Sequence, residues 1–140
     1  MKALFISFTL LGIIGACHPS LTRDGYPQVS KNYNKYTNLA EALRFHPSLT
    51  VKGTGTKADV NLTRFRNFPE YSPLYVIDGL PVGNDYFQAN ERVDMNAVIS
   101  IRIMNRPHEL IKYGSRGKYG VIIIVTSVRR ELELNEELLS

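Results

Sequence analysis

The side chains of this chain that could do chemistry are one cysteine, three histidines and an aspartate in a turn. Cys17 is the only cysteine, so its thiol can be a nucleophile or an attachment point, but it cannot form an intramolecular disulfide. The histidines are His18, His46 and His108, and their spacing fits neither an H-E-x-x-H motif nor another metal site. Asp78 precedes a glycine, where an aspartate more often forms a turn than acts as a catalyst. We therefore expect no enzyme, no metal and no cofactor.

Cys17 ends an apolar stretch at the start of the chain. A positive start, Met1-Lys2, is followed by the mostly apolar residues 3–16. This run is shorter than the roughly 20 residues that cross a bilayer, and it suits the core of a signal peptide. Ile14-Gly15-Ala16-Cys17 is similar to a bacterial lipobox, whose cysteine carries diacylglycerol. We expect Cys17 to be the lipid attachment site, which anchors the chain to a membrane without spanning it; the alternative is an ordinary secretory signal.

Length and charge limit the remaining functions. A chain of 140 residues forms one domain with a modest core. The net charge is +4, and a basic domain can indicate nucleic-acid binding. An exported lipoprotein rarely meets nucleic acid, so we expect no such partner. The basic residues could equally face anionic lipid headgroups or acidic loops of a neighbouring protein.

Polar and apolar patterns predict one clear helix and several strands. Asn38 and Glu41 have the spacing of a helix-capping box, and Pro47 disfavours helical geometry at the residue before it. Alternating or continuous apolar runs predict strands at residues 49–52, 60–66, 74–77, 98–104 and 121–125. Residues 53–57, GTGTK, lack the spacing of a phosphate-binding loop and are expected to be an ordinary loop.

Glycines mark the turns between these elements. Asp78-Gly79 is a strong turn signal, and Pro81 restricts the following residues 80–82 to a sheet edge. Gly114 is placed to end a short helix in the left-handed conformation. Residues 114–117 also match the GXXG loop of RNA-binding KH domains. A KH loop leads into a helix, whereas a β-branched run typical of a central strand follows here.

Two segments together resemble a known family. P-L-Y-V-I-D-G at residues 73–79, and Y-G-S-R-G at 113–117 followed by G-V-I-I-I-V-T at 120–126, resemble the plug domain of TonB-dependent outer-membrane receptors. The closest likeness is to the SusC/RagA-like nutrient-uptake receptors of Bacteroidetes. The resemblance covers about residues 38–127 and implies an α+β fold with a small mixed β-sheet and short helices packed on it. The motif residues are Asp78, Gly79, Tyr113, Gly114, Ser115, Arg116, Gly117 and Gly120, and we expect them to shape the domain rather than to react.

The chain departs from the family pattern in several places. Asn67 and Phe68 stand where the family has a glycine, and residues 106–109 replace small residues. No TonB-contacting box precedes the domain, and residues 18–22 lack an acidic surface-export signal. We also expect no transmembrane barrel within these residues, since one needs at least about eight strands of about ten residues.

These observations predict four segments and a role. We expect a lipoprotein signal peptide at residues 1–16, a flexible tether at 17–36, a plug-like domain at 37–128 and a charged tail at 129–140. The resemblance implies a binding or accessory module that acts with an outer-membrane receptor or a TonB-type envelope protein and does not transport by itself. We expect it at the outer membrane, facing the periplasm, with residues 80–82 and the loop 83–92 as candidate contact surfaces. The alternatives are a degenerate relic of such a receptor or, least favoured, a secreted enzyme.

Overall fold

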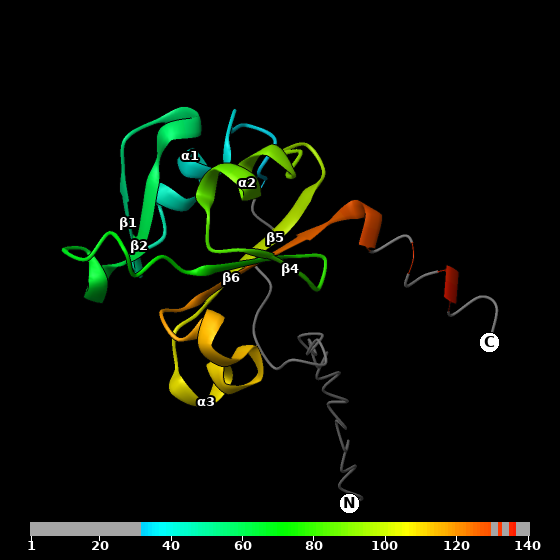
Figure 1. Ribbon diagram of the computed structural model, residues 1–140. Coiled ribbons are helices and arrows are strands. Elements are labelled where there is room, and N and C mark those ends of the chain that lie inside the picture. Colours follow the sequence, from blue (N-terminus) through cyan, green and yellow to red (C-terminus); the bar gives the residue numbers. More distant parts are fainter. Residues whose placement is uncertain (1–31, 130–131, 133–134, 137–140) are drawn as a thin grey trace, which may run out of the picture.

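The computed structural model describes residues 32–129, 132 and 135–136 (Figure 1). The predicted signal peptide, Cys17 and most of the predicted tail lie outside the described residues. The first half contains α1 (Leu39–Arg44), β1 (Leu49–Lys52), the 3₁₀ helix η1 (Gly55–Lys57), β2 (Asp59–Leu62), the 3₁₀ helix η2 (Thr63–Phe65) and β3 (Leu74–Ile77). The second half contains β4 (Leu80–Gly83), α2 (Tyr86–Glu91), β5 (Val98–Met104), α3 (Pro107–Leu110), the 3₁₀ helix η3 (Ile111–Gly117) and β6 (Val121–Thr126).

Four of the strands form a mixed sheet in the order β4-β3-β6-β5. β3 and β6 run parallel, while β4 and β5 pair antiparallel with their neighbours. β1 and β2 form a separate antiparallel pair beside this sheet. β6 is therefore a central strand, as predicted, and its β-branched side chains suit burial on both faces. The predicted α+β class, a small mixed sheet with short helices packed on it, is confirmed.

Both faces of the four-stranded sheet are covered, and the period of two along β3 and β6 divides their side chains between two cores. Tyr75 and Ile122 point into the larger core, which also holds residues of α1, α2 and the β1–β2 pair. Val76 and Val121 point into a smaller core under α3, together with Leu110. Figure 1 shows α1 and α2 on one side of the sheet and α3 on the other. Because successive side chains of a strand point to opposite faces of the sheet, strands of six or fewer residues contribute to both cores.

Helix α1 begins where the sequence predicts. The Asn38 side chain accepts a hydrogen bond from the Glu41 amide at 3.1 Å. Glu41 reaches one residue further back than a standard capping box, because its carboxylate accepts from the Thr37 amide at 2.9 Å and hydroxyl at 3.0 Å. These bonds hold the pKa of the Glu41 carboxyl below its usual value. Pro47 follows shortly after the helix ends. None of the described helices is long and apolar enough to cross a membrane.

A cluster of aromatic rings packs on the irregular segment between η2 and β3. The rings of Tyr71 and Tyr119 stack with centroids 4.2 Å apart and an interplanar angle of 6°. Phe65 meets both tyrosines edge-on at 5.6 Å. Offset and edge-to-face ring pairs are favourable geometries. This group therefore attaches the segment to Tyr119, two residues before β6 begins.

The structure differs from the sequence-based expectation at three elements. The strand predicted at 60–66 ends at Leu62, opposite the first residue of β1, Leu49. The Thr63 amide still donates to the Ser48 carbonyl at 2.9 Å, and the chain then turns into η2. The loop predicted at 83–92 contains α2, whose signal was Asp85: its side chain accepts from the Phe87 amide at 2.9 Å and caps the helix. Gly114 has a positive φ of 59°, but its ψ of −146° lies outside the left-handed helical region that the sequence predicted.

Gly120 admits no side chain, for two separate reasons. Its φ is +117°, and a Cβ atom built there would lie 2.4 Å from Cδ1 of Leu62. Gly55 has a positive φ of +58° as well, but a Cβ atom there meets nothing within 4 Å. We expect Gly120→Ala to lower the free energy of unfolding by about 3 kcal/mol, and Gly55→Ala by about 1 kcal/mol, because overpacking adds to backbone strain only at Gly120.

Urea unfolding of the two variants beside the unmodified chain measures both costs. Equal losses for the two glycines would mean that the contact with Leu62 relaxes without cost and that backbone strain alone matters.

Candidate functional site

The two motif segments lie side by side along the parallel pairing of β3 with β6. The amide of Leu74, at the start of β3, donates to the carbonyl of Gly120 at 2.9 Å. At the other end, the amide of Asp78 donates to the carbonyl of Ile124 at 2.9 Å. The sequence motifs are thus joined at both ends of β3.

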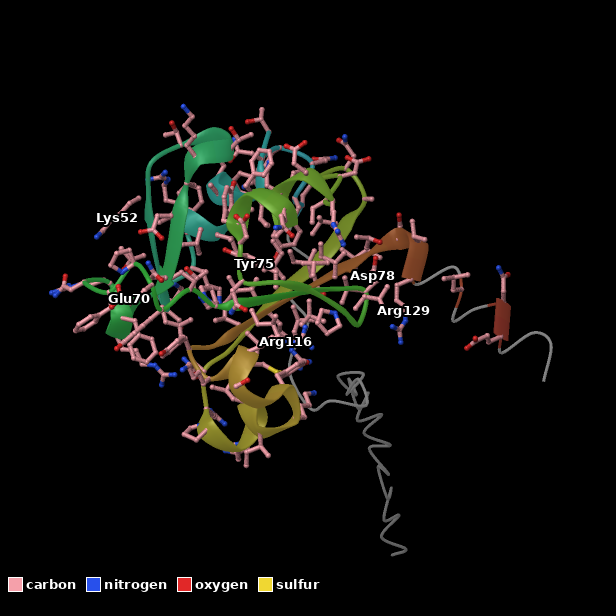
Figure 2. All side chains as sticks on the ribbon, viewed as in Figure 1. Lys52, Glu70, Tyr75, Asp78, Arg116 and Arg129 are labelled. Carbon is pink, nitrogen blue, oxygen red and sulfur yellow. The ribbon has the colours of Figure 1, made fainter. Side chains whose placement is uncertain are left out.

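Asp78 ties the β3–β4 turn to the end of β6. Its two carboxylate oxygens accept from the amide and the hydroxyl of Thr126, at 2.8 and 2.7 Å. Asp78 and Gly79 both have positive φ, 50° and 84°, as a two-residue hairpin turn requires. The guanidinium of Arg129 donates to the Asp78 carbonyl at 2.9 Å, and Figure 2 shows the two residues at the same end of the sheet. With both oxygens engaged, this carboxylate is a structural cross-link in the described domain.

The Y-G-S-R-G segment is held through its backbone. Asn84, directly after β4, donates from its side-chain amide to the carbonyls of Ser72 and Arg116, both at 3.0 Å. Gly117 is buried, and a Cβ atom there would lie 2.5 Å from Cβ of Tyr113. Ser115 and the Arg116 side chain are exposed. Asn84 is the residue that the sequence analysis missed, and nothing in its local sequence pattern indicates that it joins the two motifs.

The histidines and the cysteine that the sequence singled out are not brought together in the described part of the chain. Nδ1 of His46 accepts from the amide of Ser48 at 3.3 Å, close to the end of α1. His108 is exposed in α3, on the other face of the sheet. His18 and Cys17 lie outside the described residues. Within the described part of the chain, no three His, Cys, Asp or Glu side chains are grouped so as to hold a metal ion.

Two tyrosines buried in the larger core differ in the hydrogen bonding of their hydroxyl groups. The Tyr86 hydroxyl accepts from the Ala40 amide at 3.0 Å and lies 3.0 Å from the Gly55 carbonyl and 3.1 Å from Oδ1 of Asn90, to which it can donate. That Asn90 oxygen also accepts from the Leu39 amide at 3.1 Å, so α2 satisfies the first amides of α1. The Tyr75 hydroxyl, in contrast, has no hydrogen-bond partner among the described residues. Burial raises the pKa of both phenols.

Exposed apolar side chains occur in the two segments that the contacts of Asp78 join, the β3–β4 hairpin and the residues after β6. Leu80 is 71% exposed and Val128 is 59% exposed. We call Leu80, Pro81 and Val128 the tip surface. Ile77 and Leu80 are paired across the two-residue turn, so the backbone of Pro81 faces the free edge, where proline has no N–H to offer. An incoming strand would find few donors there, so side-chain docking suits the tip surface better than strand addition.

The Asp78–Thr126 contact can be tested with a double-mutant cycle. We expect Asp78→Ala to lower the free energy of unfolding by about 2 kcal/mol, and Thr126→Val to have little further effect in that background, because the two residues share hydrogen bonds to a charged group. Asp78→Asn keeps a residue that tolerates positive φ and is the matched control. Additive losses of stability in urea unfolding would show that the two residues are not coupled. If Asp78→Ala left the fold intact but abolished binding to a partner protein, Asp78 would have a direct role in binding.

Tyr75→Phe and Tyr86→Phe should have opposite effects. The first removes a hydroxyl without a partner, so we expect the free energy of unfolding to stay unchanged or rise by up to about 1 kcal/mol. The second leaves the Ala40 amide unsatisfied and should cost about 1–3 kcal/mol. Thermal and urea unfolding of the pair measures this, and a clear loss for Tyr75→Phe would reveal a hidden partner for its hydroxyl.

The raised pKa of Tyr86 predicts how the stability of the domain changes at alkaline pH. Because the Tyr86 pKa is higher in the folded state than its ordinary value of 10.0, its contribution to stability is complete below pH 10.0 and declines as the pH rises through the folded pKa. Tyr86→Phe should therefore make the loss of stability above that pH less steep. An unchanged slope would mean that Tyr86 titrates alike in the folded and unfolded chains.

Two comparisons with known proteins agree with this geometry. The TonB-dependent Receptor Plug Domain family matches residues 26–121. A stretch of 54 residues is 39% identical to TonB-dependent receptor P26 of Formosa agariphila, and it covers 39% of this chain and 5% of that receptor. The chain thus spans only a small part of the length of this relative. The family match begins inside the predicted tether, includes residues 73–79 and 113–117, and ends at the first residue of β6. The chain belongs to the family of TonB-dependent receptor plug domains.

Proposed function

We propose that this chain is a lipid-anchored plug domain that docks on a TonB-dependent receptor or a TonB-type protein of the outer membrane, without transporting a substrate by itself. The observation that carries the proposal is the family match over residues 26–121, which associates the chain with transport across the cell envelope. The motif segments hold the sheet together through backbone contacts and the Asp78 carboxylate, so binding would fall to other, exposed side chains. A role in docking, rather than in catalysis, fits a domain whose motif residues hold the sheet and whose exposed side chains are left for binding.

The tip surface is the part of the described domain that we assign to docking. Exposed aliphatic residues at a turn are available to fill a pocket on a partner, and such anchors supply much of the energy of an interface. Phe87 on α2, 51% exposed, is a second apolar side chain within the segment predicted as a contact. Arg129 holds the turn that presents Leu80 through its bond to the Asp78 carbonyl. This bond restrains the turn, and a preorganised turn loses less entropy on binding.

The anchor is the second part of the proposal. Cys17 would carry the lipid, and residues 17–36 would link it to the domain. The fifteen residues from Cys17 to Lys31 can span at most about 50 Å when extended, which bounds how far the domain can stand from the membrane. The end of this linker packs on the domain, since Tyr33 is only 7% exposed and contributes to the larger core. We further propose an outer-membrane location facing the periplasm and a receptor of the SusC/RagA-like type.

Capture of the tagged chain from its host, after cross-linking, tests the docking. We expect a TonB-dependent receptor in the captured material, less of it with Cys17→Ala because the anchor raises the local concentration, and less with Leu80→Ser because the tip surface loses its apolar anchor. Phe45→Ser is the matched control, since Phe45 is 68% exposed at the end of α1. Mass spectrometry identifies the captured receptor. Capture of no such receptor, or equal capture by every variant, would contradict the proposal.

A further inference from the structure

A small lobe covers the sheet face opposite α1 and α2. It consists of α3 and η3, residues 107–117, and Figure 1 shows it as a separate projection below the sheet. Leu110 attaches the lobe to the smaller core, and Tyr113 packs against the same core. Gly117, at the end of the lobe, is also buried. The Arg64 guanidinium donates to the Asn105 carbonyl at 3.1 Å and so lies beside the start of the lobe. We call residues 106–118 together with Arg64 the basic lobe.

The exposed charge on the basic lobe is almost entirely positive. The cationic side chains, all on exposed residues, are Arg64, Arg106, Lys112, Arg116 and Lys118. Residues 106–118 contain one acidic residue, Glu109, whose carboxylate accepts from the Arg106 amide at 3.4 Å and so is used within the lobe. An excess of four positive charges on one small projection favours a negatively charged partner.

The cations are positioned by aromatic rings. Nζ of Lys112 lies 5.1 Å from the centroid of the Tyr113 ring, and Nζ of Lys118 lies 4.6 Å from that of Tyr119. The Arg64 guanidinium carbon lies 4.7 Å from the centroid of the Phe65 ring. Each contact is a cation–π interaction that restrains a long side chain. The charges therefore lie close to the domain surface.

Ile111 distinguishes the kind of partner. It is 77% exposed, the most exposed of the large apolar residues in the described chain, and it is the residue before Lys112. An exposed aliphatic side chain on a cationic lobe is the pattern of a surface that lies on a membrane, where the apolar group enters the headgroup region and the cations meet lipid phosphates. Binding to nucleic-acid backbone requires the cations but gains nothing from an exposed isoleucine.

We propose that the basic lobe binds the surface of an anionic lipid bilayer, with Ile111 entering the headgroup region and Lys112 and Lys118 facing lipid phosphates. This contact is additional to an anchor at Cys17 and uses a different part of the domain from the tip surface. It does not rest on the proposed docking, because the lobe would bind anionic lipid whether or not a receptor is present.

Hydrogen–deuterium exchange of the full chain in lipid nanodiscs tests the lobe. The chain is placed in nanodiscs of phosphatidylcholine alone or of phosphatidylcholine mixed with phosphatidylglycerol. We expect the anionic lipid to slow exchange of the amides of residues 106–118 by at least about fivefold, the factor that a single membrane-bound basic side chain contributes. High salt should remove the protection, since the Debye length falls to about 3 Å at 1 M.

Variants separate the lobe from the net charge of the chain. Lys112→Gln together with Lys118→Gln should remove most of the protection, and Ile111→Ser should weaken it. The matched control is Lys57→Gln with Arg92→Gln, which removes the same charge from exposed residues of η1 and at the end of α2. We expect this control to retain the protection. Folding of each variant is checked by the exchange of the β6 amides, which should not change.

Three outcomes would overturn the proposal. The first is exchange in the lobe that does not depend on phosphatidylglycerol. The second is an equal loss of protection in the test and control pairs, which would indicate net charge without a defined surface. The third is equal protection of the lobe by duplex DNA in phosphatidylcholine nanodiscs, with no effect of Ile111→Ser, which would assign the lobe to nucleic acid instead.

Discussion

The parallel pairing of β3 with β6 is the contact on which the other parts of the domain depend. These two strands are the middle of the four-stranded sheet, and their side chains supply both cores. Both ends of the pair are fixed, by the Leu74 amide on the Gly120 carbonyl and by Asp78 on Ile124 and Thr126. The hairpin turn, the lobe and the helices are all placed relative to this pair. The two sequence segments that resemble the family, residues 73–79 and 120–126, form this pair of strands.

In this arrangement, residues that invite a chemical interpretation make contacts within the fold. A carboxylate, glycines and an arginine beside a buried strand have the composition of many sites. In the folded chain, the carboxylate closes a turn against Thr126, and the glycines allow close approach of the backbone to Leu62 and Tyr113. Two exposed surfaces of the described domain are proposed for partners, and they are of different character: the tip surface is apolar, and the basic lobe is cationic with one exposed isoleucine. They lie at different parts of the domain, so a receptor and a membrane could be contacted together.

The sequence was sufficient where local signals and tertiary contacts agree. The capped start of α1, the turn at Asp78-Gly79 and the strands at 98–104 and 121–126 follow from capping, turn and period-two patterns, and each is reinforced by packing. It was insufficient where a partner strand decides the length, as at Leu62, or where a helix of six residues carries too few periods to be recognised, as in α2. The link from Asn84 to Ser72 and Arg116 could not be predicted, because it joins carbonyls that are far apart in the chain. The tip surface was foreseen only in part, since Leu80 and Pro81 were candidates but Val128 was not.

The place of β6 at the centre of the sheet has a consequence for biosynthesis. The middle strand is the last described strand to be made, so β3 and β4 on one side and β5 on the other have no common partner until residue 126 has been synthesised. The parallel contact joins residues far apart in sequence, and such contacts form slowly. The four-stranded sheet therefore cannot be completed before β6 has been synthesised. Until then β5 has no strand to pair with, and β3 and β4 can form only an isolated hairpin, which is marginally stable by itself.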